Sequence, residues 1–305
     1  MTVTAPRTTE QRPGRGTSAG RATATSSFVA SSFVTTSVLF IAALYFLLPL
    51  LWLFFAATKS TSGLSDSFGL WFAEDVQLWQ NVVDAMQYLN GSMPRWLFNS
   101  VLYSTVGAAV SAVVSSMAGF ALAKYEFRGK GVVFGAIIAG VLIPPAVLVL
   151  PLFLMLAGVG LTNTIWAVLL PSMISPFGVY LGRVFAESAI PNGLMEAARL
   201  DGAGDIRFFF TIGIRLMGPA FVTMFLFQFV GIWNNFALPL VMLADDELYP
   251  LTLALWQLNS LVAEYPEHRP VLMAGTLISI VPLILAFCFL QRFWRAGLAA
   301  GAMKD

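Results

Sequence analysis

Long uninterrupted apolar stretches dominate the chain. A helix needs about 20 apolar residues to cross the hydrocarbon core of a bilayer. Stretches of about this length that lack Asp, Glu, Lys, Arg and His are Phe33–Ala57, Leu97–Ala123, Val132–Leu156, Thr164–Leu181, Leu216–Leu243 and Val271–Leu290. The pattern therefore predicts an all-α integral membrane protein with six transmembrane helices and with both termini on one side.

The flanks of this region differ from it in composition. Residues 1–30 are rich in Ser, Thr, Ala, Arg and Gly and hold few large apolar side chains, so we expect a disordered tail. Residues 31–292 form the expected transmembrane domain, and residues 293–305 form a second tail. A signal peptide is a competing interpretation of the first apolar stretch. That stretch is longer than the usual core of a signal peptide, and it contains Pro49 and Trp52, which favours an uncleaved span.

The distribution of basic residues predicts the orientation. The chain has 17 Lys and Arg residues. With the N-terminus inside, only Lys59, Arg95 and Arg269 lie on the outer side, beside a larger number of acidic residues. Because cytoplasmic loops carry the excess of Lys and Arg, we expect both termini in the cytoplasm.

Composition excludes several kinds of chemistry. Hydrophobic residues make up 58% of the chain and charged residues 11%, and the net charge of +1 gives no reason to expect nucleic acid as a partner. Cys288 is the one cysteine and His268 the one histidine, so we expect no metal site and no catalytic triad. The chain also has no P-loop motif for ATP.

The apolar stretches have no ionisable residue in their middle. Proton relays and voltage sensors depend on such residues, so their absence argues against a charge-driven mechanism. It favours a neutral or hydroxylated substrate and an energy source outside the bundle. A secondary transporter of a neutral solute and a membrane-embedded enzyme or assembly factor remain alternatives.

The loop at about 187–215, which is cytoplasmic in this orientation, has the most distinctive pattern. Helix-forming residues run from Leu194 to Leu200, and Gly202 and Gly204 then break the helix before Asp205 caps the next one. Leu194, Ala197, Ala198 and Asp201 share one face at helical spacing. We expect two short helices joined by a turn, with small side chains and carboxylates exposed to a partner.

The run Glu196-Ala197-Ala198, followed by Asp201-Gly202-Ala203, resembles the EAA loop of permease subunits of binding-protein-dependent ABC importers. In that family this loop is the coupling helix that docks on the ATPase subunit. The resemblance therefore implies that Glu196, Ala197, Ala198, Asp201 and Gly202 couple the chain to an ATPase. One departure is Ile214-Arg215, where the family usually has Leu-Pro, so no kink is expected at that pair, although Pro219 follows four residues later.

The resemblance extends over about residues 96–305. Further matching runs are Asn99-Ser100, Gly119 to Lys130, Ile143-Pro144, Pro151 to Phe153 and Gly160 to Thr164. The ending from Gly297 to Asp305 is similar to the tail of maltose-type permeases, which implies the carbohydrate branch. It also implies that Gly301, Ala302 and Lys304 contact the ATPase.

The resemblance implies the type I ABC importer permease fold and a sugar or polyol as substrate. Implied partners are a second homologous permease, two ATPase subunits and an extracytoplasmic sugar-binding protein. The chain itself is then not an enzyme and binds no cofactor, because ATP and Mg²⁺ belong to the partner ATPases.

Polar residues inside the fifth stretch are candidates for the substrate pathway. Trp233, Asn234 and Asn235 combine an aromatic ring with amides, which suits stacking on a sugar and bonding to its hydroxyls. Hydrogen bonds between helices are the competing interpretation of these amides, and it applies equally to Gln228 and Gln257. We also expect Pro144, Pro145 and Pro151 to bend the third span.

Overall fold

The computed structural model describes the backbone of residues 19–302 and the side chains of residues 34–291 and of Phe293. It divides into residues 1–52 and residues 53–305, which are considered separately. Every regular element among the described residues is a helix, so the all-helical prediction is confirmed there. The helix α1 (Ala19–Ala57) begins inside the segment expected to be a disordered tail, and residues 1–18 lie outside the described residues.

Four helical segments within the described residues are long and apolar enough to span a membrane: Val34–Ala57, Leu78–Lys124, Ile165–Ala189 and Pro266–Gln291. Two bent pairs of helices raise the number to as many as six, if each pair is one span. The chain is thus a multi-pass membrane protein. The expected six spans are reached only when the bent pairs are counted.

The first bent pair consists of α4 (Lys130–Leu142) and α5 (Pro145–Gly158), which meet at 107°. Pro144 and Pro145 lie at the junction, where neither has an N–H to continue the helical hydrogen bonds. The predicted bend is confirmed at these two prolines. Pro151 lies farther along, inside α5.

The second bent pair contradicts the expectation that Ile214-Arg215 removes the kink. A π-helical turn, Phe209–Gly213, lies between α9 (Asp205–Phe208) and α10 (Ile214–Leu216), and α11 (Gly218–Trp233) follows at 83°. The ring of Pro219 would clash with the carbonyl of Arg215, four residues earlier, if the helix continued straight. Pro219 therefore replaces the family proline as the cause of the bend.

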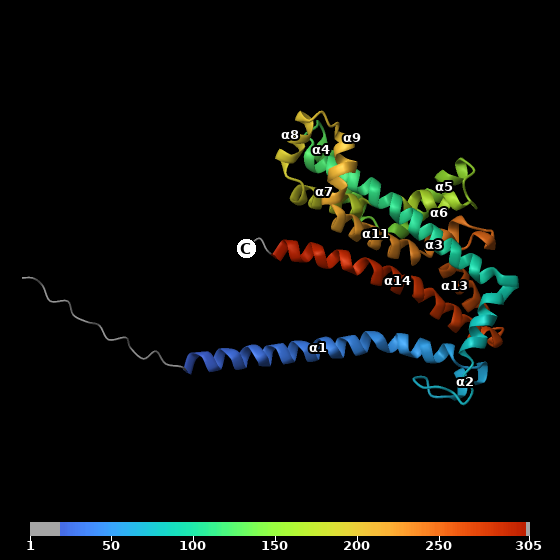
Figure 1. The fold of residues 1–305 in the computed structure, drawn as a ribbon. Helices are drawn as coiled ribbons and strands as arrows, with labels where there is room; N and C mark the ends of the chain where they lie inside the picture. Colours follow the sequence, from blue (N-terminus) through green and yellow to red (C-terminus); the bar gives the residue numbers. More distant parts are fainter. Residues whose placement is uncertain (1–18, 303–305) are drawn as a thin grey trace, which may run out of the picture. The chain divides into compact units, whose positions relative to one another are not determined.

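The core of residues 53–305 is built around α3 (Leu78–Lys124). This long helix packs against α7 (Pro176–Ala189), α11 and α14 (Arg269–Ala302), as Figure 1 shows. Small residues make the α3–α7 crossing tight, because a Cβ on Gly119 would lie 2.4 Å from the backbone of Gly182. The short helix α6 (Ile165–Ser172) also packs on α3.

The chain between α11 and α14 differs from the expected fifth span, Leu216–Leu243. The helix α11 ends at Trp233, and α12 (Ala237–Met242) begins after a break. A 3-10 turn (Asp246–Leu248) and the helix α13 (Leu251–Leu261) follow, and a second 3-10 turn, Pro266–His268, precedes α14. Trp233, Asn234 and Asn235 therefore lie at a helix end instead of inside a continuous span.

The segment expected to be external, Thr58–Trp96, contains the short helix α2 (Thr61–Asp66) and the beginning of α3. Lys59 is 1% exposed, and its Nζ donates to the carbonyl oxygen of Phe68 at 2.7 Å. Asn81 Nδ2 donates to the carbonyls of Ala57 and Lys59. These bonds fix the start of α3 against the end of α1.

Candidate functional site: a coupling loop and a broken helix

The first candidate site is the loop between α7 and α9. The helix α8 (Asn192–Leu200) has Asp201 as its C-cap, and Gly202 follows at φ +77°. The amide of Gly202 donates to the carbonyl of Arg199, and that of Ala203 donates to Ala198. Glycine is favoured here because a side chain is strained at positive φ. The sequence thus predicted the helix and its break correctly. The predicted capping by Asp205 was wrong, because Gly204 is the N-cap of α9 and Asp205 is its first residue.

We expected one face of α8 to be exposed as a whole, but its residues differ in burial. Ala198 is 8% exposed and Met195 6%, and both pack in a cluster with Phe120, Phe208 and Phe209. Ala198 therefore needs its small size for inward packing. Glu196, Ala197, Asp201 and Gly202 are exposed on the other side of the loop.

Two exposed apolar residues beside the loop were missed by the sequence reasoning. Leu200 is 90% exposed, at the end of α8, and Ile206 is 72% exposed, in α9. They lie on either side of the turn at Gly202, next to the exposed carboxylate of Asp201. The available signal for Leu200 was that it does not fall on the α8 face of Met195 and Ala198.

An ion pair closes the turn of the loop. Arg199 Nε and Nη2 each lie 3.2 Å from Asp205 Oδ1, and the guanidinium of Arg199 lies 5.8 Å from the centre of the Tyr125 ring. Burial, followed by the negative charge of Asp205, raises the pKa of the Tyr125 hydroxyl. The hydrogen bond to Asp205 raises the pKa of Arg199, which therefore stays charged.

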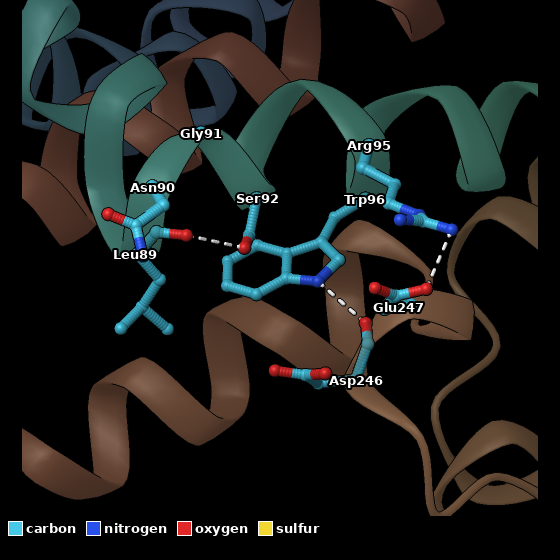
Figure 2. Close-up of a pocket in the computed structure, with 8 residues that line it drawn as sticks. All are labelled: Leu89, Asn90, Gly91, Ser92, Arg95, Trp96, Asp246 and Glu247. Carbon is cyan, nitrogen blue, oxygen red and sulfur yellow. Dashed lines mark hydrogen bonds and ion pairs between the residues drawn. The ribbon is translucent and has the colours of Figure 1, made fainter.

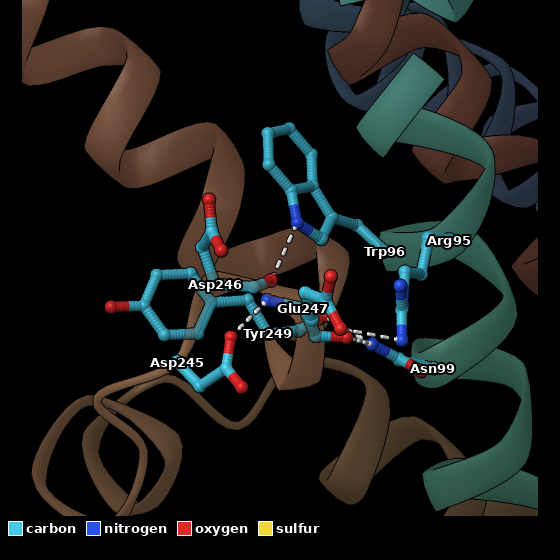
Figure 3. Close-up of polar contacts among 7 residues, drawn as sticks. All are labelled: Arg95, Trp96, Asn99, Asp245, Asp246, Glu247 and Tyr249. Atoms are coloured by element: carbon cyan, nitrogen blue, oxygen red, sulfur yellow. Dashed lines mark hydrogen bonds and ion pairs between the residues drawn. The ribbon is translucent and has the colours of Figure 1, made fainter. Parts of the chain in front are cut away.

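The opposite end of α3 is clamped to the loop that precedes α13. Trp96 Nε1 donates to the carbonyl oxygen of Asp246 at 2.8 Å, and Asn99 Nδ2 donates to that of Glu247 at 2.8 Å, as Figure 3 shows. The Tyr103 hydroxyl donates to the carbonyl of Leu248 at 2.9 Å. These donors satisfy successive carbonyls of a segment that has few backbone partners of its own.

A polar hollow lies beside this clamp (Figure 2). Its wall includes Leu89, Asn90 and Gly91, which have φ of 46°, 57° and 89° and form a left-handed turn inside α3. Arg95 and Glu247 form an ion pair of 2.9 Å across one side. Both side chains are more than half exposed, so the pair contributes little to stability.

The second candidate site is the break between α11 and α12. The indole of Trp233 is 4% exposed and stacks on Phe229, which places it in the core. Asn235 Oδ1 accepts from the amide of Leu238 at the start of α12. Asn234 is exposed, and its Nδ2 donates to the carbonyl of Val230. Of the three predicted pathway residues, Asn234 is thus the most accessible.

The other amides separate into two cases. Gln228 Nε2 donates to the carbonyl oxygen of Ser172 at 2.8 Å, which is a bond between α11 and the end of α6. Gln257 is exposed on α13. Three residues of the C-terminal tail were predicted to contact the ATPase. The backbone of two of them, Gly301 and Ala302, belongs to the end of α14, and Lys304 lies outside the described residues.

Comparison with known proteins places the chain in a family. Residues 111–296 match the family model for the binding-protein-dependent transport system inner membrane component. The chain belongs to this family. The matched part of this permease includes the loop at about 187–215, both bent helix pairs and the break after Trp233, whereas the whole of α1 and residues 58–96 precede it. Members are transport components, and the permease is therefore not an enzyme.

Individual relatives agree with this family. The permease is 38% identical over 209 residues to the arabinooligosaccharides transport system permease protein AraQ of Halalkalibacterium halodurans, covering 68% of this chain and 74% of that protein. It is 30% identical to the lactose transport system permease protein LacG of Rhizobium radiobacter, covering 89% and 96%.

A solved structure shows the same fold. The crystal structure of a bacterial ABC transporter involved in the import of the acidic polysaccharide alginate contains a chain that superimposes with a TM-score of 0.75. The match covers 88% of the permease and 98% of that chain, at 23% sequence identity.

Proposed function

We propose that this permease is one of two homologous membrane subunits of an ATP-driven importer for neutral oligosaccharides in the bacterial cytoplasmic membrane. The names of its relatives support this substrate class: they transport arabinooligosaccharides, lactose, and melibiose, raffinose and stachyose. The absence of ionisable residues from the middle of the apolar stretches agrees with a neutral cargo.

The coupling loop is the proposed entry point of energy. Leu200 and Ile206 are the most exposed large apolar side chains of this loop, ahead of Phe210 and Leu194. Exposed apolar side chains grouped beside carboxylates are typical of a contact surface for another protein. We assign the ATPase subunit to this surface, with Glu196, Ala197, Asp201 and Gly202 around it and with Ala198 supporting it from below.

Alternating access supplies the mechanism. ATP and Mg²⁺ bind on two partner ATPase subunits, and the closing of those subunits moves the coupling loop. Because Phe208 and Phe209 pack with Met195 and Phe120, a displacement of α8 is passed to the π-helical turn and the bend at Pro219. The bend then reorients α11 against α3. Gly301, Ala302 and Lys304 are assigned a second contact with the ATPases.

The outer side is assigned to an extracytoplasmic binding protein that delivers the sugar. Asp245, Asp246 and Glu247 project from the segment that α3 clamps (Figure 3). The clamp fixes the backbone of this acidic segment, so a docking protein meets a preformed surface.

The exposure of Leu200 and Ile206 is the main observation behind this proposal. Reconstitution of the complex tests it. The complex is purified through a tag on the permease and placed in proteoliposomes with its binding protein. Native mass spectrometry is expected to find two ATPase copies and two permeases. Uptake is measured with arabinotriose, lactose, diacetylchitobiose and raffinose. ATP-dependent uptake of at least one sugar is expected. Uptake that persists without ATP would indicate a secondary transporter, and a complex without ATPase would exclude the importer.

A further inference from the structure

The break between α11 and α12 lies within an apolar stretch of the chain. The helix α11 has 16 residues, and at about 1.5 Å per residue it is shorter than the roughly 30 Å hydrocarbon core. Asn234 then exposes an amide where the helix has ended. Irregular backbone at membrane depth is tolerated only where it is buried in protein or lines a water-filled cavity. Asn234 is exposed on the surface of this chain, so its amide is available to a water-filled path or to a second permease subunit.

One face of α13 is fixed beside this break. Thr252 Oγ1 donates to the carbonyl oxygen of Trp233 at 2.8 Å, which holds the start of α13 against the end of α11. One turn later, the ring of Trp256 lies 5.1 Å from the ring of Phe236, with an angle of 55° between their planes. Asn259 follows at a spacing of three residues and is exposed on the same face.

These residues bring together two kinds of groups that suit a sugar. Trp256 is 48% exposed although its ring contacts Phe236, so part of the indole is available to a ligand. Asn234 and Asn259 supply amides, which donate and accept hydrogen bonds. A pyranose or furanose ring has an apolar C–H face that packs on an aromatic ring and hydroxyls that bond to amides.

We propose that Phe236 and Trp256, together with Asn234 and Asn259, form a contact site for a neutral sugar unit during its passage. The site lies on α13 and on the α11–α12 break, and Trp256 is its main stacking surface. The inference rests on the proposed function, because it assumes a sugar as cargo. It replaces the buried Trp233 by the exposed Trp256 as the aromatic contact.

An anchor at the membrane interface is the alternative role of an exposed tryptophan. Trp166 provides the matched control, because it is 46% exposed and begins a different helix, α6. If Trp256 is only an anchor, Trp256→Ala and Trp166→Ala are expected to reduce sugar uptake to the same extent. A sugar contact is specific to Trp256.

The test uses the assembled complex in proteoliposomes with its binding protein and the four sugars named above. The variants are Trp256→Ala, Trp256→Phe, Asn234→Ala and the control Trp166→Ala. For a sugar that the wild type imports, Trp256→Ala is expected to lower uptake about tenfold, which corresponds to a loss of about 1.4 kcal/mol. Trp256→Phe keeps a ring and is expected to retain most uptake. Asn234→Ala is expected to reduce the uptake of individual sugars to different extents.

Subunit composition is expected to stay at the wild-type level in all four variants, and basal ATPase activity is expected to stay there in the control Trp166→Ala. Uptake by Trp256→Ala equal to the wild type, or reduced only as much as in Trp166→Ala, overturns the contact site and leaves the importer intact. Should Trp256→Ala fail to assemble, unequal effects of Asn234→Ala on different sugars support the site, and equal effects or none overturn it. If the wild type imports none of the four sugars, the proposed function and the contact site both fail.

Discussion

A Cβ atom on Gly119 of α3 would lie 2.4 Å from the carbonyl carbon of Gly182 on α7. No real Cβ approaches another atom so closely, and the neighbouring atoms are backbone, which cannot rotate away. The two helices therefore touch main chain to main chain at this point. Such small-residue contacts allow helices in a membrane to approach closely and gain van der Waals contact.

Replacing Gly119 by alanine is expected to force α3 and α7 apart. Overpacking of a tight contact typically costs about 1–3 kcal/mol, so the detergent-solubilised complex should unfold at a lower temperature. Gly131→Ala is the control, because a Cβ there meets nothing within 4 Å. Thermal unfolding followed by tryptophan fluorescence measures the difference. An unchanged melting temperature in Gly119→Ala would contradict the close crossing.

Gly202 provides a test of the coupling loop that depends on backbone geometry. Its φ of +77° disfavours a residue with a Cβ by roughly 1–2 kcal/mol. Gly202→Val is expected to distort the turn and to abolish uptake while the permease still inserts. Gly193→Ala, at a position with no Cβ contact within 4 Å, is expected to retain uptake. Transport and membrane fractionation distinguish loss of coupling from loss of insertion.

The sequence allowed some of these features to be predicted because their causes are local. Apolar stretches identify membrane helices by length, Pro144 and Pro145 bend the chain where they stand, and the glycine at position 202 ends a helix. The expectation of no kink at Ile214-Arg215 gave too little weight to Pro219, whose ring would clash with the carbonyl of Arg215 in α10. The residue types at positions 214 and 215 alone therefore led to the wrong expectation of a straight helix.

Other features depend on packing between distant segments and could not be read from local pattern. Ala197 and Ala198 are identical residues, and only the neighbouring Phe120 and Phe208 determine which of them is buried. Likewise, Trp233 and Trp256 are both tryptophans near amides. Trp233 is the buried one because it belongs to a cluster with Tyr103 of α3 and Val168 of α6, and the local sequence holds no signal for those contacts.

Leu200 gives a prediction that separates docking from folding. Its side chain is 90% exposed, so Leu200→Ser removes almost no contact within the permease and should leave its own thermal stability unchanged. Loss of an apolar contact with the ATPase is expected to reduce the amount of ATPase that co-purifies. Leu200→Met keeps the apolar surface and is expected to retain binding. Equal co-purification in Leu200→Ser and in the wild type would place the docking surface elsewhere.

The Tyr125 hydroxyl predicts a limited pH dependence. Burial and the charge of Asp205 raise its pKa above the ordinary value. The folded state therefore holds the proton more tightly than the unfolded state, and the resulting stabilisation is present below the unfolded pKa of about 10 and is lost as the pH rises through the folded pKa. Tyr125→Phe, which cannot ionise, should lose less stability than the wild type in this alkaline range. Parallel losses in the two proteins would exclude Tyr125 as the source.

The bond from Trp96 to Asp246 tests the outer clamp. Trp96 is 2% exposed, and its Nε1 donates at 2.8 Å to a carbonyl 150 residues later. Trp96→Phe keeps most of the ring and removes one of two donors to the Asp246 carbonyl, which also accepts from the amide of Tyr249. The loss of this one bond is expected to cost about 0.5–1.5 kcal/mol. Trp79→Phe is the control, because Trp79 is 79% exposed. Hydrogen exchange of residues 243–250 is expected to increase in Trp96→Phe alone, since the clamp holds that segment. Unchanged exchange there would show that Asn99 and Tyr103 suffice to hold it.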